Sequence, residues 1–288
     1  MFKEAMYYNK LKDSKVHCVL CPHYCVVSNG DLGICNVRKN IDGELFTINF
    51  GEITSISMDP IEKKPLYFFK PGTSILSVGS FGCNLKCSFC QNYTIAQIEE
   101  FQGKSDSVNP EELVEIILNK KDSIGIAFTY NEPSIWYEYV YEVSKLLKEK
   151  NPDKDVVLIT NGFINEEPLR KLLPYVDGMN IDLKGFNNLY YNKICGGRLE
   201  PVLKTIEIAG KTTHVEVTTL LVTGENDNLE EVENIAKFLA SVDKNIPLHL
   251  TRYFPTYKMS NPPTDLNFMY EAKKVAEKHL DRVILGNI

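Results

Sequence analysis

The chain has 288 residues, of which 43% are hydrophobic and 24% charged, and its formal net charge is −6. This length allows one large α/β domain, or one domain with a small appendage, and the composition excludes a disordered chain. Lys and Arg number 32 against 38 Asp and Glu and are scattered, so we expect no nucleic-acid surface. No apolar run approaches the about 18 residues of a membrane span, and residues 1–12 lack the apolar core of a signal peptide. We therefore expect a cytoplasmic protein without membrane contact.

The first part of the chain differs in pattern from the rest. Residues 1–73 contain a cysteine-rich segment, followed by an extended stretch with β character at residues 43–69. We predict a small Cys-rich N-terminal metal-binding module over residues 1–73, packed against a second domain over residues 74–288.

From residue 74 onward, short β-branched apolar runs alternate with segments of helical period, which predicts a parallel sheet with crossover helices. Strands are predicted at residues 74–78, 125–129, 156–159, 178–183, 214–221, 248–253 and 282–285. Helices are predicted at residues 110–119, 133–150, 166–173, 200–209, 229–241 and 267–279, with Asn109 and Asn165 as N-caps. About six right-handed βα units predict an α/β fold, a partial (β/α)6 TIM-type barrel whose functional residues follow the carboxyl ends of the strands.

Three cysteines, Cys83, Cys87 and Cys90, follow the first predicted strand at the spacing C-x3-C-x2-C, with no fourth nearby. Clustered cysteines in a reducing compartment indicate metal rather than disulfides. Three thiolates bind three irons of a cubane cluster, which leaves one iron open. The alternatives are a zinc knuckle or three ordinary thiols.

A second cluster comprises Cys18, Cys21, Cys25 and Cys35. Four thiolates suit either a closed zinc site or a second iron-sulfur cluster, and the spacing does not separate the two. His23 is a further candidate for a ligand or for a donor to a ligand, and free structural cysteines are the alternative. The eighth cysteine, Cys195, is interpreted as a buried or loop thiol.

The cysteine spacing, with an aromatic residue before the last cysteine, resembles the radical S-adenosylmethionine (radical SAM) superfamily. Together with residues 59–65, 129–133 and 182–184, it resembles the AmmeMemoRadiSam-system radical SAM enzymes, which are relatives of pyruvate formate-lyase activating enzyme. The resemblance extends from the first cysteine cluster to residues 286–287. Members of that family often continue with a cysteine-containing tail, which is not part of this sequence.

The resemblance implies a [4Fe-4S] cluster whose open iron is chelated by the amino and carboxylate groups of S-adenosylmethionine. One electron from the cluster then cleaves the sulfonium and yields a 5′-deoxyadenosyl radical that abstracts a hydrogen from a substrate. Such an oxidoreductase works anaerobically and needs an electron donor such as flavodoxin or ferredoxin. Cys83, Cys87 and Cys90 are accordingly the predicted catalytic residues.

Glu132 follows a predicted strand and precedes Pro133 at a helix start, so its carboxylate is expected at the barrel mouth. The resemblance assigns it to the ammonium group of S-adenosylmethionine, a charge-assisted contact. Its neighbour Asn131 is placed with it among the cofactor-binding residues. The alternative is an acidic residue stabilised by the positive end of a helix dipole.

Asn180, Asp182 and Lys184 alternate at the end of the fourth strand and are expected to share one face. The resemblance implies that Asp182 and Lys184 bind S-adenosylmethionine. It also implies a monovalent cation among Thr160, Asn180 and Asp182, although Ile159 stands where the activating enzymes carry an aspartate. The alternative is a self-satisfied Asp182–Lys184 pair.

Two further predictions concern the cofactor. His249, on the sixth strand, is a candidate for contact with the adenosyl ribose or the substrate, or else a satisfied strand histidine. Phe89 is expected beside the adenine by the resemblance, or as a shield for the cluster. Thr218 occupies the place of an arginine in the activating enzymes, so that contact is not carried over.

The sequence therefore predicts a radical SAM enzyme that abstracts a hydrogen from an unidentified peptide, protein or small-molecule substrate. One alternative is an activase for a glycyl-radical enzyme. From another class, the chain is a non-catalytic iron-sulfur electron carrier or binding module.

Overall fold

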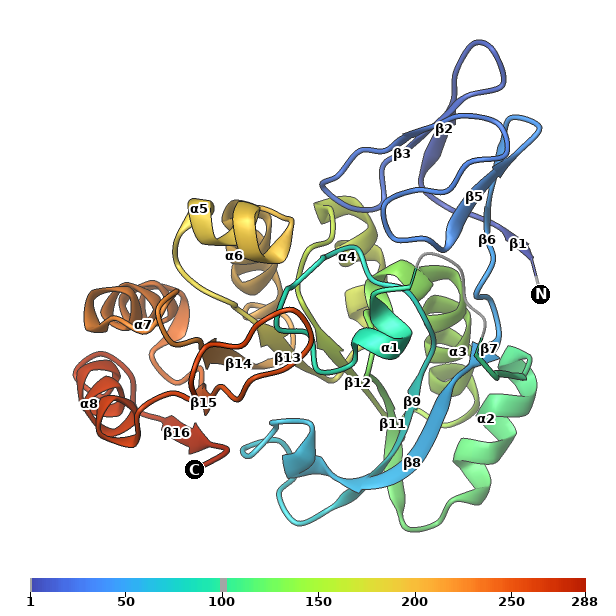
Figure 1. Cartoon of the computed structure of the whole chain (residues 1–288). Coiled ribbons are helices and arrows are strands. Elements are labelled where there is room, and N and C mark those ends of the chain that lie inside the picture. The colour runs from blue at the N-terminus through green and yellow to red at the C-terminus, as the bar shows by residue number, and fades with distance from the viewer. Residues whose placement is uncertain (1, 99–102) are drawn as a thin grey trace.

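The computed structural model describes residues 2–98 and 103–288, and an open barrel forms its centre (Figure 1). Within these residues, eight strands form one sheet in the order β16-β15-β14-β13-β12-β11-β9-β8. All neighbours are parallel except β8 and β9, which run antiparallel. The strands are β8 (Ser55–Pro60), β9 (Ser74–Gly79), β11 (Ser123–Phe128), β12 (Asp155–Thr160), β13 (Gly178–Asp182), β14 (His214–Leu221), β15 (Leu248–Arg252) and β16 (Val283–Gly286). The sequence predicted all of them except β8, which forms one edge of the sheet.

Crossover helices lie around the outside of this sheet, as Figure 1 shows. The helical segments are η1 (Ile61–Lys63), α1 (Tyr93–Ala96), α2 (Pro110–Asn119), η2 (Pro133–Trp136), α3 (Tyr137–Lys150), α4 (Glu166–Leu172), η3 (Leu173–Tyr175), α5 (Asn188–Tyr190), η4 (Tyr191–Cys195), α6 (Leu199–Ala209), α7 (Leu229–Asp243) and α8 (Leu266–Ala276). Buried aliphatic side chains of strands and helices form one continuous core between them. The predicted α/β partial barrel is confirmed.

The two predicted helix caps have different outcomes. Asn109 caps α2, since its side chain accepts from Glu112 N–H while Glu112 accepts from Asn109 N–H. Asn165 makes no such cap on α4. Asn165 stands at the N-cap position as predicted, but its amide donates to the Val19 carbonyl at 2.7 Å, so a long-range contact with the N-terminal module replaces the side-chain cap.

The N-terminal module consists of two small antiparallel sheets beside the barrel (Figure 1). One sheet contains β1 (Lys3–Glu4), β6 (Glu44–Thr47) and β5 (Arg38–Ile41), and the other contains β2 (Tyr8–Lys10), β3 (Val16–Cys18) and β4 (Val26–Val27). A further pair joins β7 (Glu52–Ile53) to β10 (Asp106–Ser107). The domain boundary after residue 73 stays a prediction, and β8 on its N-terminal side belongs to the barrel sheet.

A buried ion pair connects this module to α3. Arg38 donates to both carboxylate oxygens of Glu138, at 2.6 and 2.8 Å, and both residues are 1% exposed. Met6 N–H also donates to Glu138, and the Met6 carbonyl accepts from Arg38. Each buried charge is therefore neutralised by the other, and both side chains are hydrogen-bonded to the backbone of Met6.

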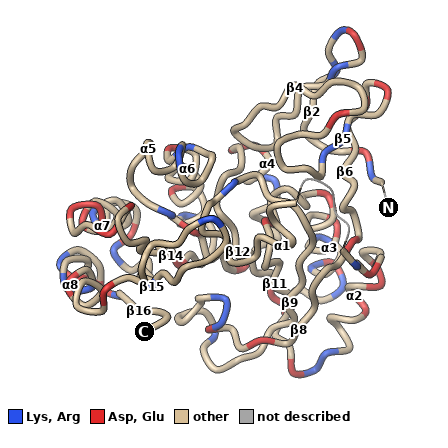
Figure 2. The backbone as a smooth tube through the Cα atoms, in the orientation of Figure 1, with Lys and Arg blue, Asp and Glu red and all other residues tan. Residues whose placement is uncertain are grey.

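Charges of both signs are interspersed over the surface helices α7 and α8 (Figure 2). Among the described residues, no helix is long and apolar enough to cross a membrane.

Candidate active site

The three cysteines lie on the loop between β9 and α1, at the carboxyl end of the first parallel strand. Gly82, just before Cys83, has a φ of 83°, and its N–H donates to Ile95 at 2.8 Å. A Cβ at Gly82 would lie 2.5 Å from Val37 and 2.7 Å from the Cys35 carbonyl. Glycine is therefore required here, and the loop packs directly on the second cysteine cluster.

The three thiols are close enough to affect one another. The pKa of Cys83 is raised well above its ordinary value by burial, by Glu132 and by the other two thiols. Burial and Cys87 likewise raise the pKa of Cys90, while Lys184 opposes this shift. These shifts favour the protonated thiols, whereas metal binding requires thiolates, so binding a metal here would release protons.

Cys83 also receives hydrogen bonds from the protein. Leu85 N–H donates to its sulfur at 3.4 Å, and the Asn161 amide donates to the same sulfur at 3.7 Å. Asn161 further donates to Asn84 and accepts from Phe163 N–H. The predicted site residues did not include Asn161, although its place directly after Thr160 at a strand end was the available signal.

Glu132 is buried beneath the loop and caps η2. It accepts from Ser134 N–H at 2.9 Å, from the Thr160 hydroxyl at 2.6 Å and from Asn161 N–H at 2.7 Å. Burial raises its pKa although these bonds favour the carboxylate. A carboxylate offers about four acceptor sites. Three are used within the protein, and the Ser134 contact places Glu132 at the start of η2, as the helix-dipole alternative requires, while its contact with S-adenosylmethionine stays a prediction.

Asn131 supports the cysteine loop through three side-chain hydrogen bonds. Its carbonyl oxygen accepts from Ser80 N–H, and its amide donates to the Phe81 and Gly82 carbonyls, both at 3.2 Å. The preceding Tyr130 has a φ of 71°, which turns the chain here. The structure therefore gives Asn131 a positioning role, and its predicted contact with the cofactor stays a prediction.

Asp182 and Lys184 form an ion pair of 3.0 Å beside the cysteines. The Lys184 ammonium lies 5.8 Å from the centre of the Phe89 ring. Burial lowers the pKa of Lys184, but Asp182 and the thiols Cys87 and Cys195 outweigh it and raise the pKa well above its ordinary value. The alternative of a paired Asp182 and Lys184 is therefore observed, and the contacts of Asp182, Lys184 and Phe89 with S-adenosylmethionine stay predictions.

The predicted monovalent-cation residues each bind a protein partner. Thr160 donates to Glu132, while Asn180 donates to the Pro65 carbonyl at 2.8 Å and accepts from Thr218 at 3.0 Å. Thr218, which stands where the activating enzymes carry an arginine, thus donates a hydrogen bond to Asn180. No contact among the described residues brings Thr160, Asn180 and Asp182 onto one ion, and that cation stays a prediction.

His249 is paired with Glu216 rather than open to a ligand. The His249–Glu216 distance is 2.6 Å, and Glu216 also contacts His214 at 2.9 Å and accepts from Tyr67 and Phe68 N–H. The structure supports the alternative of a satisfied strand histidine, and the ribose or substrate contact of His249 stays a prediction.

This buried carboxylate predicts acid sensitivity. Burial raises the pKa of Glu216, but hydrogen bonds from His214, His249 and Phe68 outweigh it and lower the pKa from 4.5 to about 2. The stabilisation is present above pH 4.5 and is lost as the pH falls through about 2, a total of about 3 kcal/mol. Urea unfolding at several pH values should show this acid loss in wild type and a flatter profile in Glu216→Gln. An equal dependence of the free energy of unfolding on pH in the two proteins would refute this prediction.

Comparisons with known proteins agree with this geometry. The Radical SAM superfamily model matches residues 77–239, which is more than half of the chain and includes all three loop cysteines. The chain belongs to the radical SAM superfamily. Uncharacterized protein MJ0808 of Methanocaldococcus jannaschii is 42% identical over 290 residues, covering 99% of this chain and 85% of that protein.

One further relative and one solved structure bear on the lineage and on the fold of this radical SAM protein. The pyruvate formate-lyase-activating enzyme of Clostridium pasteurianum is 27% identical over 227 residues, covering 74% of this chain and 91% of that protein. The crystal structure of Streptococcus suis SuiB bound to S-adenosylmethionine superimposes with a TM-score of 0.54 at 15% identity. It covers 74% of this chain and 51% of that one. The chain is homologous to the activating enzyme and shares the fold of SuiB.

Membership in the superfamily implies a [4Fe-4S] cluster and S-adenosylmethionine, and the residues present fit the cluster. Three thiols share one loop, with Cys87 buried and Cys83 and Cys90 half-buried, and an amide of the chain donates to Cys83. Within the described residues, no three His, Cys, Asp or Glu side chains are arranged to hold a single metal ion. This finding covers both cysteine clusters.

The second cysteine cluster lines one small cavity in the N-terminal module of the radical SAM protein. Cys18, Cys21, Cys25 and Cys35 surround about 10 Å³ together with Arg38. Burial raises the pKa of Cys35 to about 11. The buried Nε of Arg38 has no hydrogen-bond partner within residues 2–98 and 103–288.

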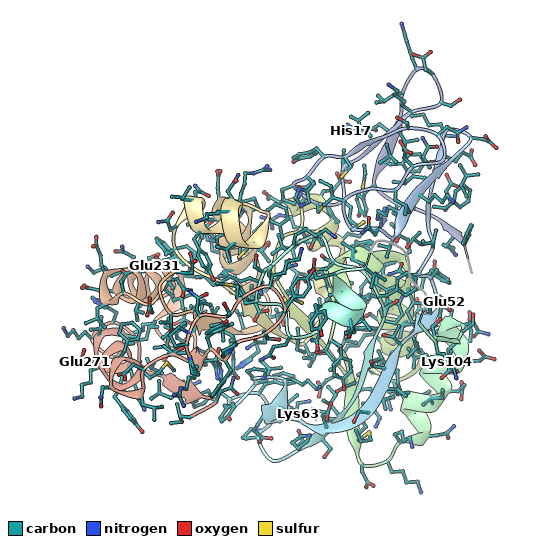
Figure 3. The ribbon with its side chains drawn as sticks, viewed as in Figure 1. His17, Glu52, Lys63, Lys104, Glu231 and Glu271 are labelled. Carbon is teal, nitrogen blue, oxygen red and sulfur yellow. The ribbon has the colours of Figure 1, made fainter. Side chains whose placement is uncertain are left out.

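His23 and the module's other contacts reach the catalytic loop. His23 lies 2.7 Å from the Asn84 carbonyl, and its ring packs 5.1 Å from Phe163. His17, the other histidine of residues 1–73, lies on β3 of the module (Figure 3). The structure therefore places His23 between the two cysteine clusters.

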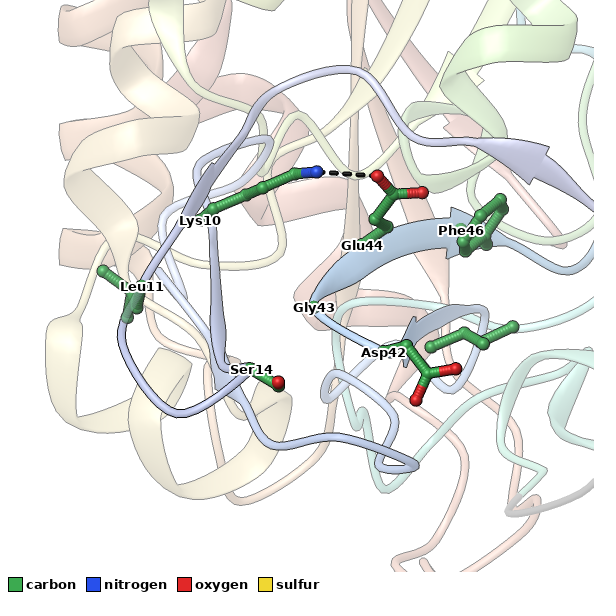
Figure 4. A pocket seen from close by; sticks show the side chains of 8 residues that line it. Lys10, Leu11, Ser14, Asp42, Gly43, Glu44 and Phe46 are labelled. Carbon is green, nitrogen blue, oxygen red and sulfur yellow. Dashed lines mark hydrogen bonds and ion pairs between the residues drawn. The ribbon is translucent and has the colours of Figure 1, made fainter.

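A larger groove of about 430 Å³ lies at the far hairpins of the module (Figure 4). Lys10 and Glu44 face each other across it in an exposed ion pair of 2.6 Å. None of the predicted site residues lines this groove, and its size alone indicates no function.

Proposed function

We propose that this protein cleaves S-adenosylmethionine reductively at a [4Fe-4S] cluster bound by Cys83, Cys87 and Cys90 and abstracts a hydrogen from a substrate. The observation that carries the proposal is the loop of three neighbouring thiols at the carboxyl end of β9, of which Cys87 is buried and Cys83 and Cys90 are half-buried. When bound, the cluster supplies one electron to the sulfonium. The protein binds and orients S-adenosylmethionine and the substrate, and it excludes solvent from the site.

Nearby side chains suit the remaining parts of S-adenosylmethionine. Glu132 has one acceptor site left for the ammonium group, and the pair of Asp182 and Lys184 lies next to the thiols. Phe89 is buried with its ring beside Lys184, where it can pack against the adenine. These assignments rest on proximity to the cysteine loop.

The test is formation of 5′-deoxyadenosine and methionine from S-adenosylmethionine in the anaerobically reconstituted full chain with dithionite. We expect both products in equal amounts. Their absence from protein with a full complement of iron and sulfide would refute the proposal and favour an electron carrier or binding module.

The substrate class follows from the family resemblance. The motifs at residues 59–65 and 129–133 favour a member of the AmmeMemoRadiSam system acting on a peptide, protein or small molecule. The homology to pyruvate formate-lyase-activating enzyme favours a glycyl-radical activase as the second candidate. Either function places the protein in the cytoplasm with an electron donor such as flavodoxin or ferredoxin.

We also propose that residues 1–73 form a module with a second metal, either zinc or an iron-sulfur cluster. Four cysteines line one cavity, and the unpartnered Arg38 Nε lies at the same cavity, where it can donate to a thiolate. Cys21→Ser in the full chain should lose this metal while the barrel cluster stays. Elemental analysis for zinc, iron and sulfide identifies it, and unchanged metal content in the variant would refute the site.

A further inference from the structure

The hydroxyl of Tyr190 lacks a partner at a place close to the cysteines. Tyr190 is 5% exposed, and its hydroxyl has no hydrogen-bond partner in the part of the chain that the structure describes. Leaving a buried polar group unsatisfied costs about 1–3 kcal/mol. A partner outside the described protein atoms is therefore indicated.

The position of Tyr190 points to the cluster. Its ring lies parallel to that of Phe89, with centres 6.4 Å apart and an interplanar angle of 16°. Phe89 stands between Cys87 and Cys90 in the sequence. Tyr190 is also near enough to Cys87 and Cys195 for both thiols to raise its pKa, after burial. Its hydroxyl thus lies in the surroundings of one predicted cluster ligand, Cys87, and of the further thiol Cys195.

Cys195 is the second group at this place. It is fully buried and lies beside Cys87, and it contributes most to raising the pKa of Cys87. The backbone around Cys195 is also bonded to the cysteine loop. Lys86 N–H donates to the Cys195 carbonyl at 2.7 Å, and Ser88 N–H donates to the Ile194 carbonyl at 3.0 Å. The thiol is therefore fixed against the cluster loop.

Two glycines after Cys195 permit this close packing. Gly196 has a φ of 70°, and a Cβ at Gly197 would lie 2.6 Å from the side chain of Leu85. The preceding turn η4 is π-helical, a form that is frequent at functional sites. Larger residues here would push the segment away from the loop.

Residues 185–195 carry both Tyr190 and Cys195, and the start of this segment is fixed by contact with α7. Glu231, labelled in Figure 3, accepts from Phe186 N–H at 2.7 Å, and a Cβ at Gly185 would meet both Glu231 and Tyr190. The Tyr191 hydroxyl accepts from Lys184 N–H. The segment that carries Tyr190 and Cys195 is therefore held at several points.

We propose that Tyr190 and Cys195 donate hydrogen bonds to sulfur atoms of the cluster beside Cys87 and thereby make the cluster easier to reduce. This inference rests on the proposed cluster at Cys83, Cys87 and Cys90. Reduction adds negative charge to the cluster, and donors to its sulfurs stabilise that charge. The two residues act through the cluster and are positioning residues.

The experiment is a redox titration of the reconstituted full chain, followed by EPR, in wild type, Tyr190→Phe and Cys195→Ala. Each variant should show a more negative midpoint potential, with the reduced-to-oxidised ratio at a fixed potential about tenfold lower. This equals about 59 mV for one electron. Cys195→Ser retains a donor and should recover most of the shift.

Tyr139→Phe is the matched control, because its buried hydroxyl donates to the Val108 carbonyl, away from the cluster. It should leave the potential unchanged but lower the stability of the metal-free protein. Tyr190→Phe should shift the potential but leave the stability of the metal-free protein unchanged, since the Tyr190 hydroxyl has no partner within the described fold.

Wild-type potentials in Tyr190→Phe and Cys195→Ala with full iron content would overturn the inference. So would a change confined to the KM for S-adenosylmethionine, which would assign the Tyr190 hydroxyl to that ligand. Loss of the cluster in Cys195→Ser would make Cys195 a ligand instead. The shifts would still stand if wild type bound the cluster but formed no 5′-deoxyadenosine, and only the proposed function would then fail.

Discussion

Cys83→Ala is expected to abolish 5′-deoxyadenosine formation, down to the level of a protein-free reaction. Cys83 is one of three thiols on the loop, and its sulfur also accepts from Asn161. Two remaining thiolates leave two irons without a protein ligand, so the cluster is lost. Iron and sulfide content, visible absorbance and product formation are measured together on the anaerobic protein.

Cys195→Ser is the matched control for this prediction. It removes a buried thiol that contacts Cys87 yet lies outside the three-cysteine loop. The account expects a full cluster and continued product formation in this variant. Full iron content in Cys83→Ala together with cluster loss in Cys195→Ser would show that the ligands are wrongly assigned.

Arg38→Met should lower the free energy of unfolding by about 3–5 kcal/mol. The substitution leaves the buried Glu138 carboxylate without its charged partner, although Met6 N–H still donates to it. Urea denaturation of the metal-free protein at neutral pH measures the loss. Measuring without metal separates the ion pair from the neighbouring cysteine site.

Lys10→Met is the control, because its ion pair with Glu44 is similar in length but exposed. Such an exposed pair contributes little to stability, because water and salt screen it. The double variant Arg38→Met/Glu138→Leu should recover part of the stability, since no buried charge is then left unpaired. An equal, small effect of Arg38→Met and Lys10→Met would contradict the account.

The sequence predicted the repeating elements because local rules determine them. The helix at residues 110–119 was predicted with its observed bounds, since Asn109 and Pro110 mark its start and the apolar period continues to its end. The parallel strands were recognised by their β-branched runs. The edge strand β8 was placed with the N-terminal module because antiparallel pairing with β9 is a long-range property.

The site was predicted in part for the same reason. The cysteine loop and the Asp182–Lys184 pair follow from short spacings, and the structure brings them together. Asn161, Tyr190 and Cys195 were missed as site residues, because contact with the cysteine loop depends on how segments far apart in sequence pack. For His249 and Asn131, the observed partners explain the residues without a ligand.

The central claim is a cluster with three cysteine ligands and one iron open to S-adenosylmethionine. EPR of the dithionite-reduced, reconstituted full chain, before and after addition of S-adenosylmethionine, tests it most directly. The account predicts a [4Fe-4S] signal that changes on addition and is lost in Cys83→Ala. A signal that S-adenosylmethionine leaves unchanged, in protein with a full cluster, would contradict it.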